Sequence, residues 1–351
     1  MLAGTERHPH ARAVLRTDAP SHAYLFHGPA GAGKRAVARE FAAALLAGDD
    51  EGARARVMSG AHPDLTWVTP SGAAEMLVGD IEPVVAAASH TPFEAPRRVF
   101  VIEGADRLIE AAANKMLKTL EEPPEFAHLV LLTDRPGNVL PTIASRCQPV
   151  RFDAPSTEEL AARLRVDPEL ARACARLSLG DAERAERLAY QPALRASAEG
   201  YVRSALRDEL AARPWRAILE QAKAAGDAAA SACEEQGAAD LEVASTKDRK
   251  RVERETTERA RRASRRAATA TLDHVLQLVG LWLRDCAAVA DGADGAALNS
   301  DRLDALREDA ALRDGRRFRT AIGLVDDTRQ RLVLNVSEEL ALEALAYRLA
   351  D

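Results

Sequence analysis

Residues 22–48, HAYLFHGPAGAGKRAVAREFAAALLAG, combine a short apolar run, a glycine-rich turn and an apolar pattern with helical spacing. The run HAYLF at 22–26 is typical of a buried strand. The apolar positions that recur at helical spacing after the turn are Val37, Phe41, Ala44 and Leu45. Since this spacing places side chains on one face of a helix, we predict a strand, a loop and a helix in that order.

Strand and helix patterns continue to alternate up to about residue 153. The apolar runs that predict strands lie at 65–68, 99–102 and 128–133. Helical patterns lie near 80–89 and at 112–122, and Pro123 and Pro124 end the second of them. The intervening residues 48–62 are polar and glycine-rich. This alternation predicts a parallel sheet covered by helices on both faces.

From residue 154 onward the strand signal all but disappears, and Ala, Leu, Arg and Glu dominate in helical periods. Pro155 and Ser156 mark one boundary, and Gln191 with Pro192 marks a second. We therefore predict an α/β domain at 1–153, a small helical lid at 154–192 and an all-α domain at 193–351.

Composition places the chain among globular proteins. Its 351 residues are 47% hydrophobic and 29% charged, which is too apolar for a disordered chain. Every stretch free of charged residues is shorter than a spanning helix needs, and the N-terminus lacks an apolar signal core, so we expect a cytoplasmic protein without membrane contact. The four cysteines form no CxxC pair, which predicts free thiols and no structural zinc.

The net charge is −6, although one segment is strongly basic. A stand-alone nucleic-acid binder would usually be basic overall, so DNA contact requires a local patch or partner proteins. Residues 247–266 hold ten basic and four acidic side chains. This segment is either a long solvated helix with i,i+4 charge pairs or a contact surface for DNA phosphates or a partner subunit.

The turn at 28–34 satisfies G-x-x-x-x-G-K between a predicted strand and a predicted helix. Backbone N–H groups around Gly28, Gly31 and Gly33 can surround phosphate oxygens, and Lys34 can reach the outer phosphates. An ordinary glycine turn is the alternative. Position 35 is Arg, where a working site has Ser or Thr to ligate magnesium. We expect weak ATP or ADP binding, or none.

A second departure from an active nucleotide site follows the run at 99–102. Glu103 can stand where a P-loop hydrolase has its metal-side Asp. Gly104 comes next and has no side chain with which to polarise an attacking water. Together with Arg35, this position predicts that the chain does not hydrolyse nucleotide.

Four segments bring a known family into view. They are HAYLFHGPAGAGK at 22–34, HPDL at 62–65, VFVIEGADRLIEAAANKMLKTLEEPP at 99–124 and HLVLLTDRPGNVLPTIASRC at 128–147. In this order they resemble the AAA+ subunits of the bacterial DNA polymerase III clamp loader, and the delta-prime type most closely. The resemblance covers residues 21–153 and is fainter in the helical remainder. It implies an AAA+ module with a helical lid, followed by a helical collar for oligomerisation.

The resemblance also implies roles for individual residues. Arg146 in Ser145-Arg146-Cys147 matches an arginine finger that acts in trans on the ATP of a neighbouring subunit, where a planar cation neutralises charge on the transferred phosphoryl group. A surface salt bridge at a helix end is the alternative role. Thr133 matches a sensor residue at a strand end, and local packing is its alternative role.

Two further positions depart from the active members of the family. In LSLGDAERA, at 177–185, Glu183 falls where active subunits carry a sensor arginine, although a shift by one residue places Arg184 there. The family often has a four-cysteine zinc module before the HPD segment, and residues 46–61 contain no cysteine. Zinc is therefore not expected, and no cofactor is required.

The resemblance leaves three functional hypotheses. In the first, the chain is a largely non-hydrolysing subunit that works with gamma/tau-type ATPase subunits, a delta-type subunit and the sliding clamp, and meets primed DNA through the complex. In the second, it is an active gamma/tau-like ATPase, which Arg35, Gly104 and Glu183 oppose. An unrelated P-loop kinase or DNA-repair ATPase is the third, which the SRC and KTLEEPP segments disfavour.

Overall fold

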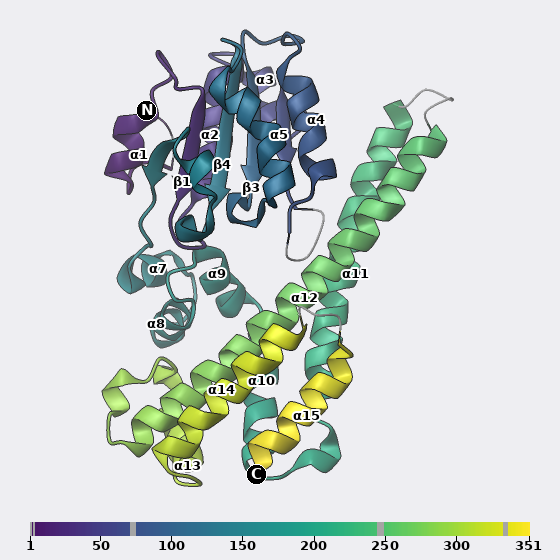
Figure 1. Ribbon diagram of the computed structural model, residues 1–351. Helices are drawn as coiled ribbons and strands as arrows, with labels where there is room; N and C mark the ends of the chain where they lie inside the picture. Colours follow the sequence, from purple (N-terminus) through teal and green to yellow (C-terminus); the bar gives the residue numbers. More distant parts are fainter. Residues whose placement is uncertain (1, 3, 71–74, 244–248, 333–335) are drawn as a thin grey trace. The chain divides into compact units, whose positions relative to one another are not determined.

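A five-stranded parallel sheet forms the centre of the first of two units (Figure 1). The structure is a computed structural model that describes residue 2 and residues 4–70, 75–243, 249–332 and 336–351. The strands are β1 (Ala23–His27), β2 (Leu65–Val68), β3 (Arg98–Glu103), β4 (Ala127–Thr133) and β5 (Gln148–Arg151). They lie in the order β2-β3-β4-β1-β5, and every pair is parallel.

Both faces of this sheet are buried, because alternate residues of each strand pack into two separate cores. Tyr24, Phe26 and Val101 pack toward one core, and Leu25 and Ile102 pack toward the other. The first core is completed by α1 (Pro9–Val14), α2 (Lys34–Leu46) and α3 (Glu51–Ser59). The second is completed by α4 (Val78–Ala88), α5 (Glu110–Glu121) and α6 (Pro141–Ala144). The continuous apolar runs of β3 and β4 follow from this two-sided burial.

The sequence pattern predicts four of the five strands, and the structure confirms them within a residue or two. The strand β5 is not predicted, because only Val150 of its four residues is buried and Pro149 interrupts it. Such a composition is typical of an edge strand. The polar segment 48–62 forms the helix α3, whose N-cap Asp50 accepts hydrogen bonds from the backbone of Gly52 and Ala53.

The HPDL segment anchors the loop that precedes β3. Asp64 is buried, and its carboxylate accepts the backbone N–H groups of Phe93, Glu94 and Ala95 at 2.7–3.0 Å. Burial acts to raise the pKa of Asp64, but these hydrogen bonds and the charge of Arg98 together lower it below its usual value. This residue therefore has a structural role.

The second unit is helical and comprises Thr157–Leu179 and Arg184–Asp351. Its shorter helices are α7 (Thr157–Arg163), α8 (Pro168–Leu177), α10 (Pro192–Leu206), α13 (Leu303–Ala310), α14 (Gly315–Leu332) and α15 (Glu338–Ala350), and α9 (Ala182–Tyr190) begins in the first unit. The two longest are α11 (Trp215–Val243) and α12 (Arg249–Ala290). The boundary between lid and collar at about residue 192 stays a prediction.

The helices α11 and α12 lie side by side in an antiparallel pair (Figure 1). Glycines allow this close approach: a Cβ on Gly226 would come within 2.9 Å of the Ser264 Oγ, and one on Gly237 within 2.2 Å of the Thr256 Cγ2. Of the basic segment 247–266, residues 249–266 form the first part of α12, whereas 247 and 248 lie outside the described residues.

Buried ion pairs connect the other helices of this unit. Arg195 of α10 donates two hydrogen bonds to Asp301 at 2.6 and 2.7 Å, with both side chains almost inaccessible to solvent. Asp309 of α13 is fully buried and pairs with Arg207 at 2.6 Å, while the indole of Trp282 donates to it at 3.0 Å. Removing one partner would leave a buried charge uncompensated, so each pair fixes the packing of its helices.

None of the described helices combines the length and the apolar composition that a membrane span requires.

The stability of the helical unit is predicted to fall on acidification because of His274. Burial, followed by the charges of Arg184 and Arg187, lowers the pKa of His274 to about 4 from 6.5. Between these values the unfolded chain binds a proton that the folded chain does not, so folding loses up to about 3 kcal/mol as the pH falls through this window. Urea unfolding at about pH 7 and about pH 5 measures the part of this loss that falls between them, about 2 kcal/mol.

The variant His274→Gln removes the titrating group, and we expect it to flatten this pH dependence. The matched control is His90→Gln, at an exposed histidine of the first unit. An unchanged pH dependence in His274→Gln would contradict the prediction.

Candidate functional site

The candidate nucleotide site lies where the carboxyl ends of three neighbouring strands meet. The glycine loop 28–33 follows β1, Glu103 ends β3 and Thr133 ends β4. In the sheet register Thr133 pairs with His27, and Glu103 pairs with Leu132. The parallel sheet therefore brings these predicted site residues together, at the edge where α/β proteins bind ligands.

The glycines of the loop are required by its backbone. Gly28 has φ +146°, and a Cβ there would lie 2.1 Å from the carbonyl oxygen of Phe152. Gly31 has φ +70°, and a Cβ there would lie 2.4 Å from the Cα of Asp181. Gly33 has φ +89° and caps the N-terminus of α2. Only glycine meets the conformational and spatial demands at the first two positions.

The Lys34 ammonium group is engaged by the protein itself. It is buried and donates to the carbonyl oxygens of Gly28 at 2.7 Å and Pro29 at 2.6 Å. It also pairs with Asp134 at 2.6 Å. Since an ammonium group has three donors, these contacts satisfy all of them. A phosphate that approached Lys34 would have to displace at least one of these partners.

Arg35 occupies the position of the missing metal ligand and pairs with Glu103. The other carboxylate oxygen of Glu103 accepts the indole N–H of Trp67 at 2.7 Å. The carboxylate that was predicted on the metal side is therefore held by a cation and a neutral donor. Gly104, at φ +73°, follows directly and begins a turn of 3-10 helix.

Thr133 is also committed to local contacts. Its hydroxyl donates to Asp106 at 2.7 Å and accepts the backbone N–H of Arg135 at 3.0 Å. The side chain is almost fully buried. These contacts tie the end of β4 to the turn after β3, as the local-packing role requires.

Arg146 lies apart from the glycine loop in the chain, two residues beyond the short helix α6. Its guanidinium donates to the carbonyl oxygen of Thr142 at 2.9 Å and pairs with Glu121 at the end of α5. The side chain remains 34% exposed. Next to it, burial raises the pKa of the Cys147 thiol to about 12, so this neighbour is a neutral core residue. The guanidinium is thus held by partners in the same unit and is still partly exposed.

The segment 180–183 packs against the glycine loop within the first unit. Gly180 has φ +88°, and Glu183 lies in the first turn of α9. A Cβ on Gly31 would approach not only the backbone of Asp181 but also its carboxylate, at 2.5 Å. An acidic side chain beside the loop opposes phosphate binding electrostatically. Sequence reasoning missed Asp181, because its proximity to the loop arises only in three dimensions.

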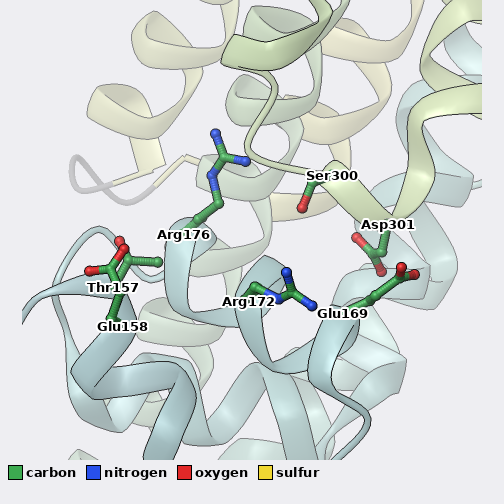
Figure 2. A pocket seen from close by; sticks show the side chains of 7 residues that line it. All are labelled: Thr157, Glu158, Glu169, Arg172, Arg176, Ser300 and Asp301. Atoms are coloured by element: carbon green, nitrogen blue, oxygen red, sulfur yellow. The ribbon is translucent and has the colours of Figure 1, made fainter.

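The helical unit has a cavity of about 560 Å³ that we also considered. Figure 2 shows its lining residues, which come from α7, α8 and the turn at Ser300–Arg302. They are Thr157, Glu158, Glu169, Arg172, Arg176, Ser300 and Asp301. Two arginines and three acidic residues line the cavity, so neither sign of charge dominates it. Among the described residues, His, Cys, Asp and Glu side chains form no cluster of three suited to a metal ion.

Comparisons with known proteins show which proteins the chain is similar to. Residues 7–156 match the family model described as "DNA polymerase III, delta subunit". The chain is 35% identical to DNA polymerase III subunit delta' of Bacillus subtilis over 182 residues, 49% of this chain and 55% of that one. It is also 35% identical to subunit delta' of Pseudomonas aeruginosa over 218 residues, 56% of this chain and 66% of that one. The family model and these two relatives support a clamp-loader subunit of the delta-prime type.

One further sequence relative and one solved structure also resemble the chain. DNA polymerase III subunit tau of Bacillus subtilis is 33% identical over 152 residues, 41% of this chain and 27% of that one. A gamma subunit-related protein of Thermotoga maritima shares the fold, with a TM-score of 0.53 and 18% identity over 97% of this chain and 98% of that one. The chain thus spans between half and two thirds of the curated delta' proteins it matches.

The residues at the glycine loop fit a nucleotide only in part. The glycine loop has the geometry that could surround phosphate oxygens. The metal position does not fit Mg²⁺, since Arg35 supplies a positive charge there and offers no hydroxyl ligand. Asp134 pairs with Lys34, and Trp67 donates to Glu103. Neither residue belongs to a sequence motif, so the sequence alone does not identify them as part of the site.

We expect Arg35→Thr to strengthen binding of Mg·ATP by at least about tenfold, because it supplies a hydroxyl ligand and frees Glu103 for the metal. Isothermal titration of the full chain with ATP, with and without Mg²⁺, measures the change. The matched control is Arg35→Lys, which keeps the positive charge and should show no gain. Equal affinities of the Thr and Lys variants would contradict the prediction.

Proposed function

We propose that this chain is a delta-prime-like clamp-loader subunit that presents Arg146 in trans to ATP on a neighbouring ATPase subunit and hydrolyses little or no ATP itself. In this role it helps to load a sliding clamp onto primed DNA during replication. One contrast within the same unit carries the proposal. Arg146 is partly exposed, whereas Lys34 and Arg35 at the glycine loop are paired with carboxylates of the protein itself.

The position of Arg146 supports a role toward another subunit. Its guanidinium is supported by the Thr142 carbonyl and by Glu121, both in the same unit, and it has one-third of its surface in solvent. A planar cation supported in this way can neutralise charge on a phosphoryl group across an interface. The contact with Glu121 is a surface ion pair, which a stronger anion can replace.

The glycine loop supports the absence of hydrolysis by the chain itself. Hydrolysis requires a metal, a phosphate-binding lysine and a group that orients water. Here Arg35 pairs with the candidate metal ligand, Lys34 pairs with Asp134, and Gly104 has no side chain to orient water. Each of these three features interferes with a different requirement for hydrolysis, so all three support the same proposal.

The partners proposed here follow from the family. They are gamma/tau-type ATPase subunits, a delta-type subunit and the sliding clamp, with primed DNA bound through the complex. The helical unit would supply the collar that holds these subunits together. We assign neither zinc nor nucleotide as a required cofactor.

An active gamma/tau-like ATPase is the second candidate. The 33% identity to subunit tau of Bacillus subtilis and the preserved glycine-lysine loop favour it. The Arg35–Glu103 pair and Gly104 favour the first candidate.

The proposal predicts that Arg146→Ala lowers ATP hydrolysis by a loader rebuilt with gamma/tau-type and delta-type subunits. At the one ATP site that Arg146 faces, the expected loss is roughly 10³–10⁵-fold, and the total turnover falls by the share of that site. Turnover is measured with clamp and primed DNA present, and the chain alone serves as the blank.

The matched control is Arg12→Ala, which removes an exposed arginine of α1 in the same unit. It should assemble and hydrolyse ATP like the unmodified chain. Gel filtration of each complex separates a lost finger from a lost subunit. Hydrolysis by the chain alone, or full turnover with Arg146→Ala, would favour the active-ATPase candidate.

A further inference from the structure

The helix α12 carries four arginines on one face of its first half. Arg254, Arg261, Arg262 and Arg265 are spaced i, i+7, i+8 and i+11, and all four side chains are exposed. This spacing places them along one helix face over about 16 Å. Thr256 and Ser264, which contact the glycines of α11, lie on another side of the helix. The four side chains therefore form a stripe, here called the arginine stripe, that α11 does not cover.

No carboxylate of the described residues forms an ion pair with the arginine stripe. Within the described part of the chain none of its four guanidinium groups pairs with a carboxylate, and that of Arg262 donates only to the backbone carbonyl of Glu258. Glu258 lies on the same face and forms no ion pair there. Exposed acids also lie on α11, at Glu220, Asp227 and Glu234, but they reach no arginine of the stripe. Elsewhere in the helical unit, exposed arginines such as Arg307 and Arg319 do pair with aspartates.

The surroundings of the stripe favour a polyanion over a protein partner. Protein interfaces centre on buried apolar and aromatic side chains. Among the described residues of α11 and α12, no large hydrophobic side chain is exposed, and the two tryptophans, Trp215 and Trp282, are buried. The absence of exposed aromatic rings also removes the stacking platform that single-stranded nucleic acid uses. The row of four arginines, with Glu258 among them, matches the spaced phosphates of a nucleic-acid backbone, which guanidinium groups bind in bidentate geometry.

We propose that the arginine stripe of α12 binds the phosphate backbone of duplex DNA without reading its sequence. The surface lies on the α11–α12 pair in the helical unit, and it is separate in sequence from the glycine loop and from Arg146. The inference goes beyond the proposed function and does not depend on the role of Arg146. Backbone contacts of this kind position a protein on DNA and carry no base specificity.

Fluorescence anisotropy of the full chain with a labelled duplex tests the proposal at several salt concentrations. The variant Arg254→Gln/Arg261→Gln/Arg262→Gln/Arg265→Gln should bind at least tenfold more weakly at low salt. The slope of log affinity against log salt should decrease in magnitude by about 3 to 4, because each lost phosphate contact releases about one counterion fewer. The substitutions lie at exposed positions and glutamine preserves helix propensity, so far-ultraviolet circular dichroism should be unchanged.

A matched control removes the same charge from sites outside α12. Arg163, Arg216, Arg316 and Arg317 are exposed, and their substitution by glutamine also removes four positive charges. We expect this control to retain most of the affinity and the salt slope. If both variants lost the same affinity for duplex DNA, net charge alone would explain the loss, and the proposal would be overturned. It would also be overturned if the stripe variant bound duplex normally but failed to enter the rebuilt complex, since the stripe would then be a protein contact.

Discussion

The parallel direction of β1, β3 and β4 is the constraint on which the candidate site depends. Their carboxyl ends meet at one edge of the sheet. Three segments that are far apart in the sequence therefore end at aligned positions, no more than one residue apart in the pairing of the strands. This arrangement requires both faces of the sheet to be buried, which explains the apolar runs 99–102 and 128–133. It also requires glycine at Gly28, because the chain turns against the backbone of Phe152 as it leaves the sheet.

At this edge, internal ion pairs engage the groups that a working P-loop uses to hold its ligand. In a working P-loop, a hydroxyl and a carboxylate share a metal ion. Here Arg35 supplies the positive charge next to Glu103, and Asp134 supplies the negative charge next to Lys34. Because Lys34 and Glu103 are almost buried, each would be costly if left unpaired. The ion pairs therefore stabilise the closed loop in the absence of nucleotide, whereas an active site must leave the same groups available.

The sequence predicts the parts of this site that depend on local pattern. The glycine loop, the substitution at Arg35 and the strands that end at Glu103 and Thr133 all have periodic or motif signals. The partners of these residues could not be predicted, because Asp134, Trp67 and Asp181 meet them only through the fold.

The same limit applies to the fold as a whole. The edge strand β5 lacks an apolar run, and α3 begins at a capping aspartate within a polar segment. In the helical unit, periodicity indicates helices but not the contacts between them. The approach of α11 to α12 depends on small residues, and their pairing follows from tertiary packing.

The free energies of two contacts decide whether the ion pair with Glu121 would prevent Arg146 from binding a phosphoryl group. Arg146 and Glu121 are 34% and 47% exposed, and an ion pair at this exposure contributes at most about 1 kcal/mol. An arginine finger that raises turnover 10³–10⁵-fold stabilises the transition state by about 4–7 kcal/mol. In the proposed role, the stabilisation of the transition state would therefore exceed the free energy of the contact with Glu121 by several kcal/mol. The contact with Glu121 can orient the side chain in the free subunit without competing with the proposed role of Arg146 in the assembled one.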